Sequence, residues 1–396
     1  MTAIFKKKSN YPIGLDISDL SLKFVQLHKT KDSIDVQSFS KISLSKGWIE
    51  NGEIKNKKKV LTHIKKLIDN PKFGKVSSNR VVSCLPEATT FIKLIKIEGD
   101  PEDLEEAIIF ELNKHIPMSI EDVYYDYQII KKNSEEKLVI FGAAPKKIVD
   151  DYVQLLKEAG LSIQAMEIES TAIARSILLE ENPYFLDKKD KNYIIIDMGA
   201  NRSSVFVYSR GTILFDVSIP ISGQRISERI SEKSQIDIKK VDLVKIVCGL
   251  DNKKCKGIVE NNLSLMIDKL ISKLEGVIKY YDSHFSEYGA LDKILICGGG
   301  ANIESIDKKI EAKVNIKTEI ANPFINLNKP SQVSINLSKP REIFVKNFTE
   351  VYKLDANLVE NLSFSQKKRK ILTVKQDSSI TYVTSIGLAL RNIFMD

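Results

Sequence analysis

Residues 193–207 constrain the fold more than any other stretch, with the sequence Tyr-Ile-Ile-Ile-Asp-Met-Gly-Ala-Asn-Arg-Ser-Ser-Val-Phe-Val. An apolar run ends at Asp197, Gly199 and small polar residues interrupt it, and a second β-branched run follows. This pattern predicts two strands joined by a tight turn. We expect Gly199 to take a positive φ that turns backbone N–H groups toward an anion, and Asp197 to hold the hydration shell of a cation. A single copy fits both a plain hairpin and a phosphate-binding turn.

A second copy of the pattern occupies residues 13–27. When Asp16 is aligned with Asp197, Ser18 falls on Gly199 and Lys23 falls on Ser204. Similar units at long separation indicate a duplicated architecture, in which two hairpins grip the phosphates of a nucleotide from both sides of a cleft. Because Ser18 stands where a glycine is expected, we expect the first loop to be strained or reshaped.

Length and composition exclude several classes of protein. With 396 residues the chain predicts two or three domains of roughly 150 residues each. Hydrophobic residues at 43% and charged residues at 28% are ordinary globular proportions, which excludes global disorder and a fibrous class. The net charge of +8 comes from lysines in short, separate runs at 6–8, 57–59 and 367–370, unlike the concentrated basic and aromatic surface of a nucleic-acid binder. A weak attraction to an anionic membrane surface stays open.

The cysteines and the apolar runs predict the cellular setting. Cys84, Cys248, Cys255 and Cys297 form no Cys-x-x-Cys motif, so we expect neither a disulfide framework nor a zinc site, and a reducing cytoplasm fits best. No run of about 18 apolar residues occurs, so we expect neither a secretion signal nor a membrane span.

Residues 87–145 predict a small inserted domain of strand, helix, strand and strand. His115 and the tyrosines at 124, 125 and 127 have the residue types of a catalytic site. The end of a helix and the alternation of a strand explain these positions better than catalysis does.

Three further features have both a structural and a functional interpretation. Glu169 is at the start of an expected helix. It is either an acid that the helix dipole favours at this end or a carboxylate that faces a cleft. Asp242 and Lys245 lie one helical turn apart on one face of a helix. They form either a surface ion pair or contacts to a ligand. Gly298, Gly299 and Gly300 follow an apolar strand and precede an expected helix at 301–312, which lets a ring or a phosphate approach the backbone. No phosphate-binding loop of the type Gly-x-x-x-x-Gly-Lys-Ser/Thr occurs.

Five stretches occur in the order typical of the actin, Hsp70 and sugar-kinase superfamily. Residues 16–23 resemble its first phosphate motif, 169–174 its first connecting helix, 197–204 its second phosphate motif, 298–300 its adenosine motif and 384–390 its second connecting helix. Within that superfamily the chain resembles the PilM family of actin-like pilus assembly proteins. This resemblance rests on residues 105–117 followed by 123–127, on 322–324 and on 386–391.

The resemblance implies an α/β fold of the actin-like, ribonuclease H-like type, a duplicated two-lobed ATPase fold with a small inserted α+β subdomain. The first lobe would comprise 1–86 and 146–190, with the insert at 87–145. The second lobe would comprise 191–223 and 290–378, with a helical subdomain at 224–289 and an irregular surface excursion at 325–378. Residues 379–396 would form a C-terminal helix returning to the first lobe.

The resemblance also implies ATP or ADP with Mg²⁺. The phosphates would meet two loops, formed by Ser18, Asp19, Ser21, Leu22, Lys23, Gly199, Ala200, Asn201 and Ser203. The ribose and adenine would meet Gly223, Asp242, Lys245, Gly298, Gly299, Gly300 and Asn302. Asp16 and Asp197 would hold Mg²⁺ mainly through water, since the ion dehydrates reluctantly. Glu169 is the candidate for orienting a hydrolytic water, and we expect at most slow hydrolysis, with the nucleotide in a structural or regulatory role.

The implied partner is the cytoplasmic N-terminal tail of a PilN-like inner-membrane protein. This tail would lie between the insert and the first lobe, near Ile116, Pro117 and Tyr125. Other pilus platform proteins and a second copy of the chain are further implied partners. The expected location is the cytoplasmic face of the inner membrane, with indirect membrane contact.

Two alternative functions stay open. A small-molecule kinase of the same superfamily needs a base in a substrate cleft, and only the generic Asp residues offer one. A division protein similar to FtsA would carry a basic amphipathic membrane helix after a C-terminal linker, whereas this sequence stops two residues after Phe394.

Overall fold

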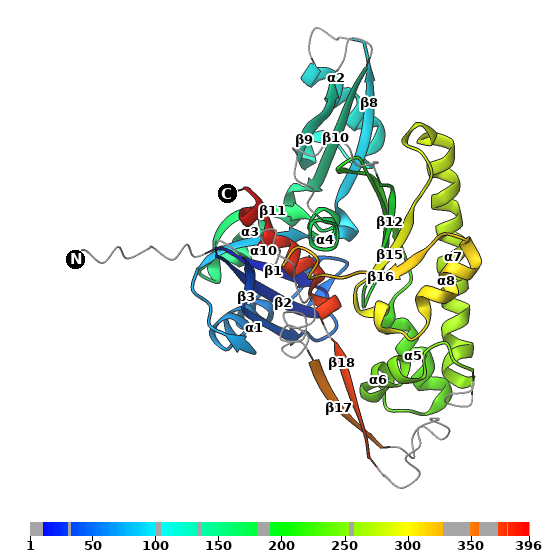
Figure 1. The fold of residues 1–396 in the computed structure, drawn as a ribbon. Helices are drawn as coiled ribbons and strands as arrows, with labels where there is room; N and C mark the ends of the chain where they lie inside the picture. The colour runs from blue at the N-terminus through cyan, green and yellow to red at the C-terminus, as the bar shows by residue number, and fades with distance from the viewer. Residues whose placement is uncertain are drawn as a thin grey trace, which may run out of the picture. The chain divides into compact units, whose positions relative to one another are not determined.

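The chain divides into two compact units (Figure 1). The computed structural model describes residues 11–30, 33–99, 104–132, 136–179, 191–252, 257–327, 349–355, 371–377 and 379–395. Unit 1 takes Met1–Asn182, Pro323–Phe344 and Tyr382–Asp396, and unit 2 takes Pro183–Asn322 and Val345–Thr381. Each unit contains β-strands and buried hydrophobic residues.

Unit 1 is built on a sheet with the strand order β11-β7-β1-β2-β3-β6. Its strands are β1 (Ile13–Ser18), β2 (Ser21–Lys29), β3 (Ile34–Ser43), β6 (Phe73–Gly74), β7 (Arg80–Leu85) and β11 (Ser162–Ile168). β1, β2 and β3 are antiparallel, whereas β7 and β11 run parallel to β1. A short hairpin of β4 (Ile49–Glu50) and β5 (Glu53–Ile54) follows β3.

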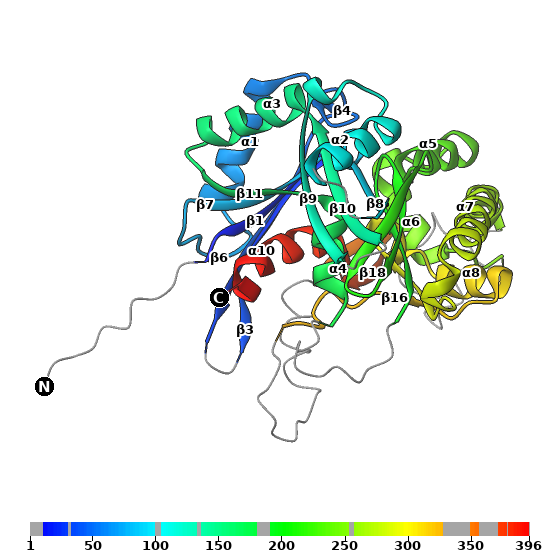
Figure 2. The same ribbon diagram turned by 90° about the horizontal axis from the view of Figure 1, so that it is seen from above.

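The two faces of this sheet have different helices, as the alternation of side chains along a strand requires. Ile13, Leu15 and Ile17 of β1 share one core with α1 (Lys57–Asp69) and α3 (Lys146–Glu158). The opposite face carries α10 (Val383–Met395), as Figure 2 shows. There Gly14 has no room for a side chain, because a Cβ atom would lie 2.2 Å from the carbonyl oxygen of Ser385.

Helix α4 (Glu169–Ile177) packs closely against α10. A Cβ atom on Gly387 of α10 would lie 1.7 Å from the carbonyl oxygen of Ala172 in α4. The Arg175 guanidinium adds a hydrogen bond of 3.0 Å to the carbonyl oxygen of Gly387. The two helices therefore pack on each other without room for a side chain at Gly387, and both contact β7.

The insert has the expected order of strand, helix, strand and strand. It consists of β8 (Phe91–Glu98), α2 (Leu104–His115), β9 (Val123–Lys132) and β10 (Glu136–Pro145), preceded by a 3-10 turn at Glu87–Thr89 and with another at Ile120–Asp122. β10 lies between β8 and β9, antiparallel to both. Ile108 and Leu112 of α2 are fully buried against Ile95 and Phe141 of the sheet, which gives the insert a core of its own.

Unit 2 repeats the strand pattern of unit 1. Its strands are β12 (Tyr193–Met198), β13 (Ser203–Ser209), β14 (Thr212–Ile219), β15 (Lys293–Cys297) and β16 (Thr318–Ile320). The order β16-β15-β12-β13-β14 matches β11-β7-β1-β2-β3, with an antiparallel hairpin flanked by two parallel strands in both. The duplicated architecture expected from the two hairpins is confirmed.

The helices of unit 2 are α5 (Gly223–Ser234), α6 (Ile238–Cys248), α7 (Ile258–His284) and α8 (Ile306–Val314), with 3-10 turns at Ser286–Tyr288 and Gly299–Asn302. Leu263, Ile267, Leu270 and Leu274 form the buried stripe of α7 at helical spacing. The helix expected from residue 301 is wrong in its start, because the triple glycine first forms the 3-10 turn and α8 begins at Ile306.

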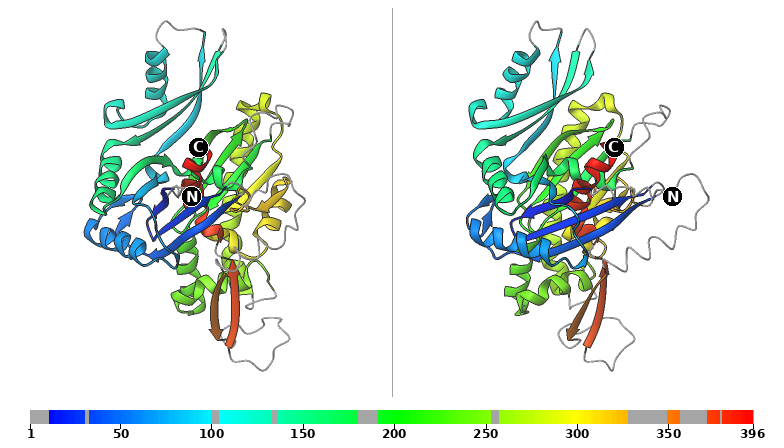
Figure 3. Two further views of the ribbon diagram at one scale, coloured as in Figure 1. Left: turned by 60° about the vertical axis from the view of Figure 1, so that its left-hand side comes forward. Right: turned by 90° about the vertical axis from the view of Figure 1, so that its left-hand side faces the viewer.

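The excursion expected to be irregular contains a hairpin. β17 (Thr349–Asp355) and β18 (Ile371–Asp377) pair antiparallel along their whole length (Figure 3). The expectation was wrong for these residues, and residues 328–348 and 356–370 lie outside the described part of the chain. A 3-10 turn at Ser379–Tyr382 then leads into α10.

Two further expectations concern cysteines and membranes. Cys84 and Cys297 are free and buried, whereas Cys248 is disulfide-bonded, so the expectation that no disulfide forms was wrong at Cys248. Sequence spacing alone does not show which thiols approach each other in space. None of the helices within the described residues has the length and apolarity that crossing a bilayer requires.

Candidate functional site

Asp16 is a buried carboxylate with two partners on its own hairpin. Its side chain lies on the face of β1 that carries α10, and it is 2% exposed. Lys23 lies opposite it in the register of β1 and β2, with its Nζ 2.5 Å from Asp16 Oδ2. The Ser18 hydroxyl donates a hydrogen bond of 2.7 Å to Asp16 Oδ1. The pairing compensates a charge that burial would otherwise penalise.

Asp16 also belongs to a cluster with Cys84 of β7 and Glu169 of α4. One ligand atom of each residue lies within 4.8 Å of the other two. Burial, together with the charges of Glu169 and Asp16, raises the pKa of the Cys84 thiol well above its usual value, so the thiol stays protonated at neutral pH. The two carboxylates are the hard oxygen donors that suit a hydrated Mg²⁺, and the thiol is not.

Glu169 combines the two roles that its sequence position left open. It lies in the first turn of α4, where the helix dipole favours an acid. It also faces the Asp16 cluster, and its Oε1 accepts a hydrogen bond of 3.1 Å from the Thr384 hydroxyl of α10. Sequence reasoning did not identify Thr384 as a partner of this carboxylate, because 215 residues separate the two.

The first loop is a turn from Ser18 to Ser21 without the expected strain. Ser18 does not have a positive φ, so a glycine is not required there, and the expectation of a strained loop was wrong. The Asp19 carboxylate accepts hydrogen bonds of 3.0 Å from the backbone N–H groups of Asn51 and Gly52. The side chain of Leu22 is fully buried. Because the Asp19 carboxylate is engaged and the Leu22 side chain is buried, these two residues could contact a ligand mainly through their backbone groups.

The second loop differs from its prediction at Gly199. Gly199 does not have a positive φ, and glycine is needed because a Cβ atom would lie 2.6 Å from the carbonyl oxygen of Arg202. The buried Ser203 hydroxyl donates to the carbonyl oxygen of Ile221 at 2.9 Å. Ala200 and Asn201 are exposed. Arg202 adds to this loop a cation that the sequence-based set did not include.

The second loop is attached to the N-terminus of α5. The backbone N–H groups of Gly223 and Gln224 donate to the carbonyl oxygens of Gly199 and Ala200, at 3.2 and 2.9 Å. The helix N-terminus therefore lies beside the loop, where its dipole favours an anion.

Lys245 and Asp242 differ in their availability to a ligand. The ammonium of Lys245, which is 8% exposed, contacts the carbonyl oxygen of Gly223 at 3.0 Å, the Ser227 hydroxyl at 2.6 Å and Asp242 Oδ1 at 2.7 Å. An ammonium has three hydrogens, so these contacts engage all of them. The side chain of Asp242 is 71% exposed, and its Oδ1 also accepts a hydrogen bond of 2.7 Å from the Ser227 hydroxyl.

The triple glycine lies directly against Asp197. Gly298 has a φ of 76°, and a Cβ atom there would lie 2.2 Å from Asp197 Oδ1. The Cys297 thiol contacts the same oxygen at 3.7 Å. A glycine is needed at 300 because a Cβ atom there would lie 2.5 Å from Cβ of Met198. Gly299 is exposed with open space around it, and its carbonyl oxygen accepts a hydrogen bond of 3.4 Å from the Asn302 side chain. The structure thus brings together two motifs that lie 100 residues apart.

The three residues expected to bind a partner peptide differ in how far their side chains are exposed. Ile116 is 6% exposed and belongs to the core of the insert, so its side chain is not available to a peptide. Pro117 is exposed, and Tyr125 packs half-buried on that core. The neighbouring Tyr124 donates a hydrogen bond of 3.3 Å to Asp150 of α3, so it lies between the insert and the rest of unit 1.

Asp16 with the first loop lies in unit 1, and Asp197 with the second loop lies in unit 2. The expectation that both loops hold one nucleotide, and that both aspartates hold one Mg²⁺, therefore stays a prediction.

Comparison with known proteins shows the family and the fold. The family described as type IV pilus assembly protein PilM matches residues 14–344. A solved structure described as the PilM-PilN type IV pilus biogenesis complex is similar over 97% of this chain and 98% of that chain, with 17% identity and a TM-score of 0.71. The ethanolamine utilization protein EutJ from Carboxydothermus hydrogenoformans is similar over 80% of this chain and 88% of its own, with 13% identity and a TM-score of 0.50. The fold is therefore actin-like, as the family resemblance implied. Because the family match covers most of the sequence, the chain belongs to the PilM family of type IV pilus assembly proteins.

Proposed function

We propose that the protein is an actin-like, nucleotide-binding scaffold of the type IV pilus assembly platform at the inner membrane. The match of residues 14–344 to the PilM family carries this proposal. The partner would be the cytoplasmic N-terminal tail of a PilN-like membrane protein, because the similar structure is that of a PilM-PilN complex. Through this tail the protein would lie at the cytoplasmic face of the membrane.

The nucleotide would be ATP or ADP, held by both hairpin loops. Lys23, Arg202 and the N-terminus of α5 offer positive charge or N–H groups to the phosphates. The exposed Asp242 carboxylate suits a ribose hydroxyl, and the backbone at Gly298 and Gly299 suits the close approach of a flat ring. Mg²⁺ would be held through water by Asp16, Glu169 and Asp197, and it would neutralise phosphate charge.

Glu169 is the candidate for orienting a water molecule beside the phosphates. The Thr384 hydroxyl donates a hydrogen bond of 3.1 Å to Glu169 Oε1 and so orients the carboxylate, whose oxygens accept hydrogen bonds. We expect slow hydrolysis at most, with the nucleotide acting as a structural or regulatory ligand, because the second carboxylate of the cluster, Asp16, is already held by Lys23 and Ser18.

A peptide with the N-terminal sequence of the PilN-like protein from the same genome tests the partner. We expect it to bind the full chain in a fluorescence anisotropy titration, with affinity that changes when ATP and Mg²⁺ are added. Tyr124→Ala and Tyr125→Ala should each weaken binding about tenfold, as truncation of an aromatic contact does. Leu265→Ala is the matched control, since Leu265 is equally exposed on α7 of the other unit.

Each result has a distinct meaning. No binding of the peptide to the full chain would overturn the proposed partner. Binding that is unaffected by both tyrosine variants would keep the partner and overturn its placement on the insert.

A further inference from the structure

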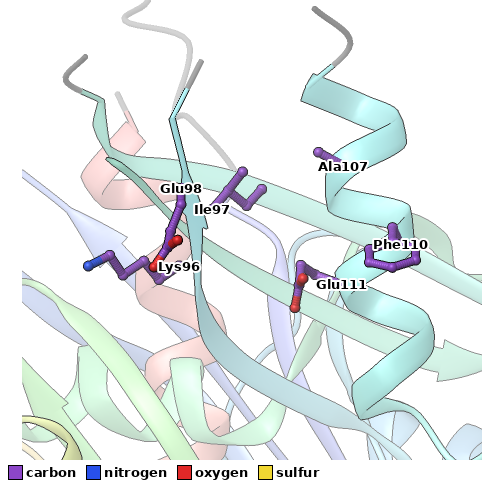
Figure 4. Close-up of a pocket in the computed structure, with 6 residues that line it drawn as sticks. All are labelled: Lys96, Ile97, Glu98, Ala107, Phe110 and Glu111. Atoms are coloured by element: carbon purple, nitrogen blue, oxygen red, sulfur yellow. The ribbon is translucent and has the colours of Figure 1, made fainter. Parts of the chain in front are cut away.

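A pocket of about 400 Å³ lies between α2 and the far end of β8 (Figure 4). Lys96, Ile97 and Glu98 of β8 line one side, and Ala107, Phe110 and Glu111 of α2 line the other. Ile97 points into the space between strand and helix, and Glu111 extends from the helix toward the strand. The volume accommodates one or two large side chains, within the range of about 300–1,000 Å³ that is usual for ligand pockets.

Phe110 gives this pocket an apolar wall in contact with water. Its side chain is 64% exposed, which is unusual for a phenylalanine in a soluble domain. The Lys114 ammonium lies 4.2 Å from the centre of its ring. The exposed ring therefore already accepts a cation at its face, and it offers an apolar edge to an incoming side chain.

The stretch of sequence that supplies most of the pocket lining is acidic in a chain that is positive as a whole. From residue 98 to residue 111 the sequence has seven acidic residues and no lysine or arginine, whereas the whole chain has a net charge of +8. Of these, Glu98 and Glu111 line the pocket beside Lys96, and Glu105 and Glu106 lie in the first turn of α2. Glu111 also forms an ion pair of 2.5 Å with Lys114. The chemistry that fits is an apolar side chain followed by lysines.

The chain contains that chemistry at its own N-terminus, outside the described residues. Residues 4–8 read Ile-Phe-Lys-Lys-Lys, and residues 1–10 contain no acidic residue. The phosphate, cofactor and partner roles proposed above make no use of this segment.

The segment cannot reach the pocket of its own molecule. Tyr11 is buried, and its carbonyl oxygen accepts a hydrogen bond of 2.8 Å from the Gln26 side chain. Tyr11 therefore fixes the point, at the N-terminal end of β1, from which residues 1–10 (the tail) extend. The insert leaves from the C-terminal end of β7, which is parallel to β1, and β8 then leads away from that end (Figure 1). The six residues of β1 and the eight of β8 span roughly 20 and 26 Å, whereas the seven residues from Phe5 to Tyr11 span at most about 25 Å.

We propose that the pocket between α2 and β8 binds residues 4–8 of a second copy of this chain. Phe5 would pack on Phe110 and Ile97, and the lysines would pair with Glu98 and, in exchange with Lys114, with Glu111. The contact joins two different surfaces, so it is heterologous, and each molecule has one tail and one pocket. This self-association is independent of the proposed nucleotide and PilN-like partners.

A peptide titration tests the contact directly. A labelled peptide of residues 1–12 should bind the chain that lacks residues 1–10, with an affinity that falls as salt is raised, because exposed charges are screened. Phe110→Ala and Glu98→Lys should each weaken binding at least tenfold. Leu265→Ala and Glu50→Lys, which change exposed residues elsewhere, should leave it unchanged.

A mixing experiment tests the arrangement in the full chain. In sedimentation velocity, neither the full-length Phe110→Ala variant nor the chain without residues 1–10 should self-associate. A mixture of the two should form a pair, because one supplies an intact tail and the other an intact pocket. Thermal unfolding of each variant confirms that it is folded.

Three results would overturn the proposal. The first is no peptide binding at 1 mM, and the second is binding that Phe110→Ala and Glu98→Lys do not affect. The third is peptide binding to phosphatidylglycerol vesicles but not to the protein, which would make the segment a membrane anchor.

Discussion

At the scale of single residues, Lys23 and Asp16 form the pair that most affects both stability and ligand binding. The two side chains are 12% and 3% exposed, so water compensates neither charge well. A buried pair costs little while it is intact, and it costs several kcal/mol when one partner is removed. Lys23 therefore has a structural role in addition to its predicted contact with phosphate.

Lys23→Met should lower the free energy of unfolding by about 3 kcal/mol, because it leaves the Asp16 carboxylate buried without its cation. The double variant Asp16→Asn with Lys23→Met should recover part of this loss, since it removes the unpaired charge. Urea unfolding of the two single variants and the double variant measures the coupling. Additive losses would show that the two groups do not interact.

The residue scale also shows where sequence reasoning reached its limit. Asp16, Asp197 and Gly298 were identified because their motifs contain an acid or glycines at fixed spacing. The predicted reason for a glycine at position 199, a positive φ, was wrong. The carbonyl oxygen of Arg202 leaves no room for a side chain there. Thr384 and Cys84 were missed as neighbours of Glu169 and Asp16, since a contact between residues far apart in the sequence leaves no local pattern.

At the scale of elements, the crossing of α4 and α10 depends on Gly387. Gly387→Ala should lower the free energy of unfolding by about 2 kcal/mol or more, because the new Cβ atom would overlap the carbonyl oxygen of Ala172 at 1.7 Å. Thermal or urea unfolding measures the change.

Gly276 provides the matched control in another helix. A Cβ atom at Gly276 in α7 meets no atom within 4 Å. Gly276→Ala should therefore raise the free energy of unfolding by about 0.5–1 kcal/mol, as expected for alanine in place of glycine in a helix. Equal effects of the two substitutions would contradict the close packing of α4 and α10.

Elements with a strong period were predicted from sequence, and elements without one were not. The insert has clear alternation and helical spacing, and its elements formed in the expected order. β17 and β18 were missed because asparagine, serine and proline dominate the surrounding segment, although both strands contain β-branched residues. Residues 301 and 302, which were expected to begin a helix, belong to the 3-10 turn at Gly299–Asn302, where Gly300 packs against Met198.

At the scale of the whole molecule, the proposed nucleotide should protect loops in both units. Hydrogen exchange with and without ATP and Mg²⁺ should slow at residues 18–21 in unit 1 and at residues 199–203 in unit 2. Asp197→Asn should reduce the protection in both loops, because one shared ligand couples them. Protection of only one loop would contradict a single nucleotide held by both units.

The fold of the whole molecule was accessible from sequence because it is duplicated. Two hairpins with the same spacing of acid and small residues indicated two equivalent sheets, and the strand orders agree. The pocket at Phe110 had no such signal. It depends on the distance between α2 and β8, which sequence patterns do not contain.

The position of α10 has a consequence for synthesis on the ribosome. The Ser385 hydroxyl donates to the carbonyl oxygen of Lys23, across 362 residues, and α10 covers one face of the first sheet. At about 5–20 residues per second, β1 and β2 emerge tens of seconds before the helix that covers them. During this time the apolar face around Gly14 and Val82 lacks its native cover, so the nascent chain should be a substrate for chaperones until its last helix is released.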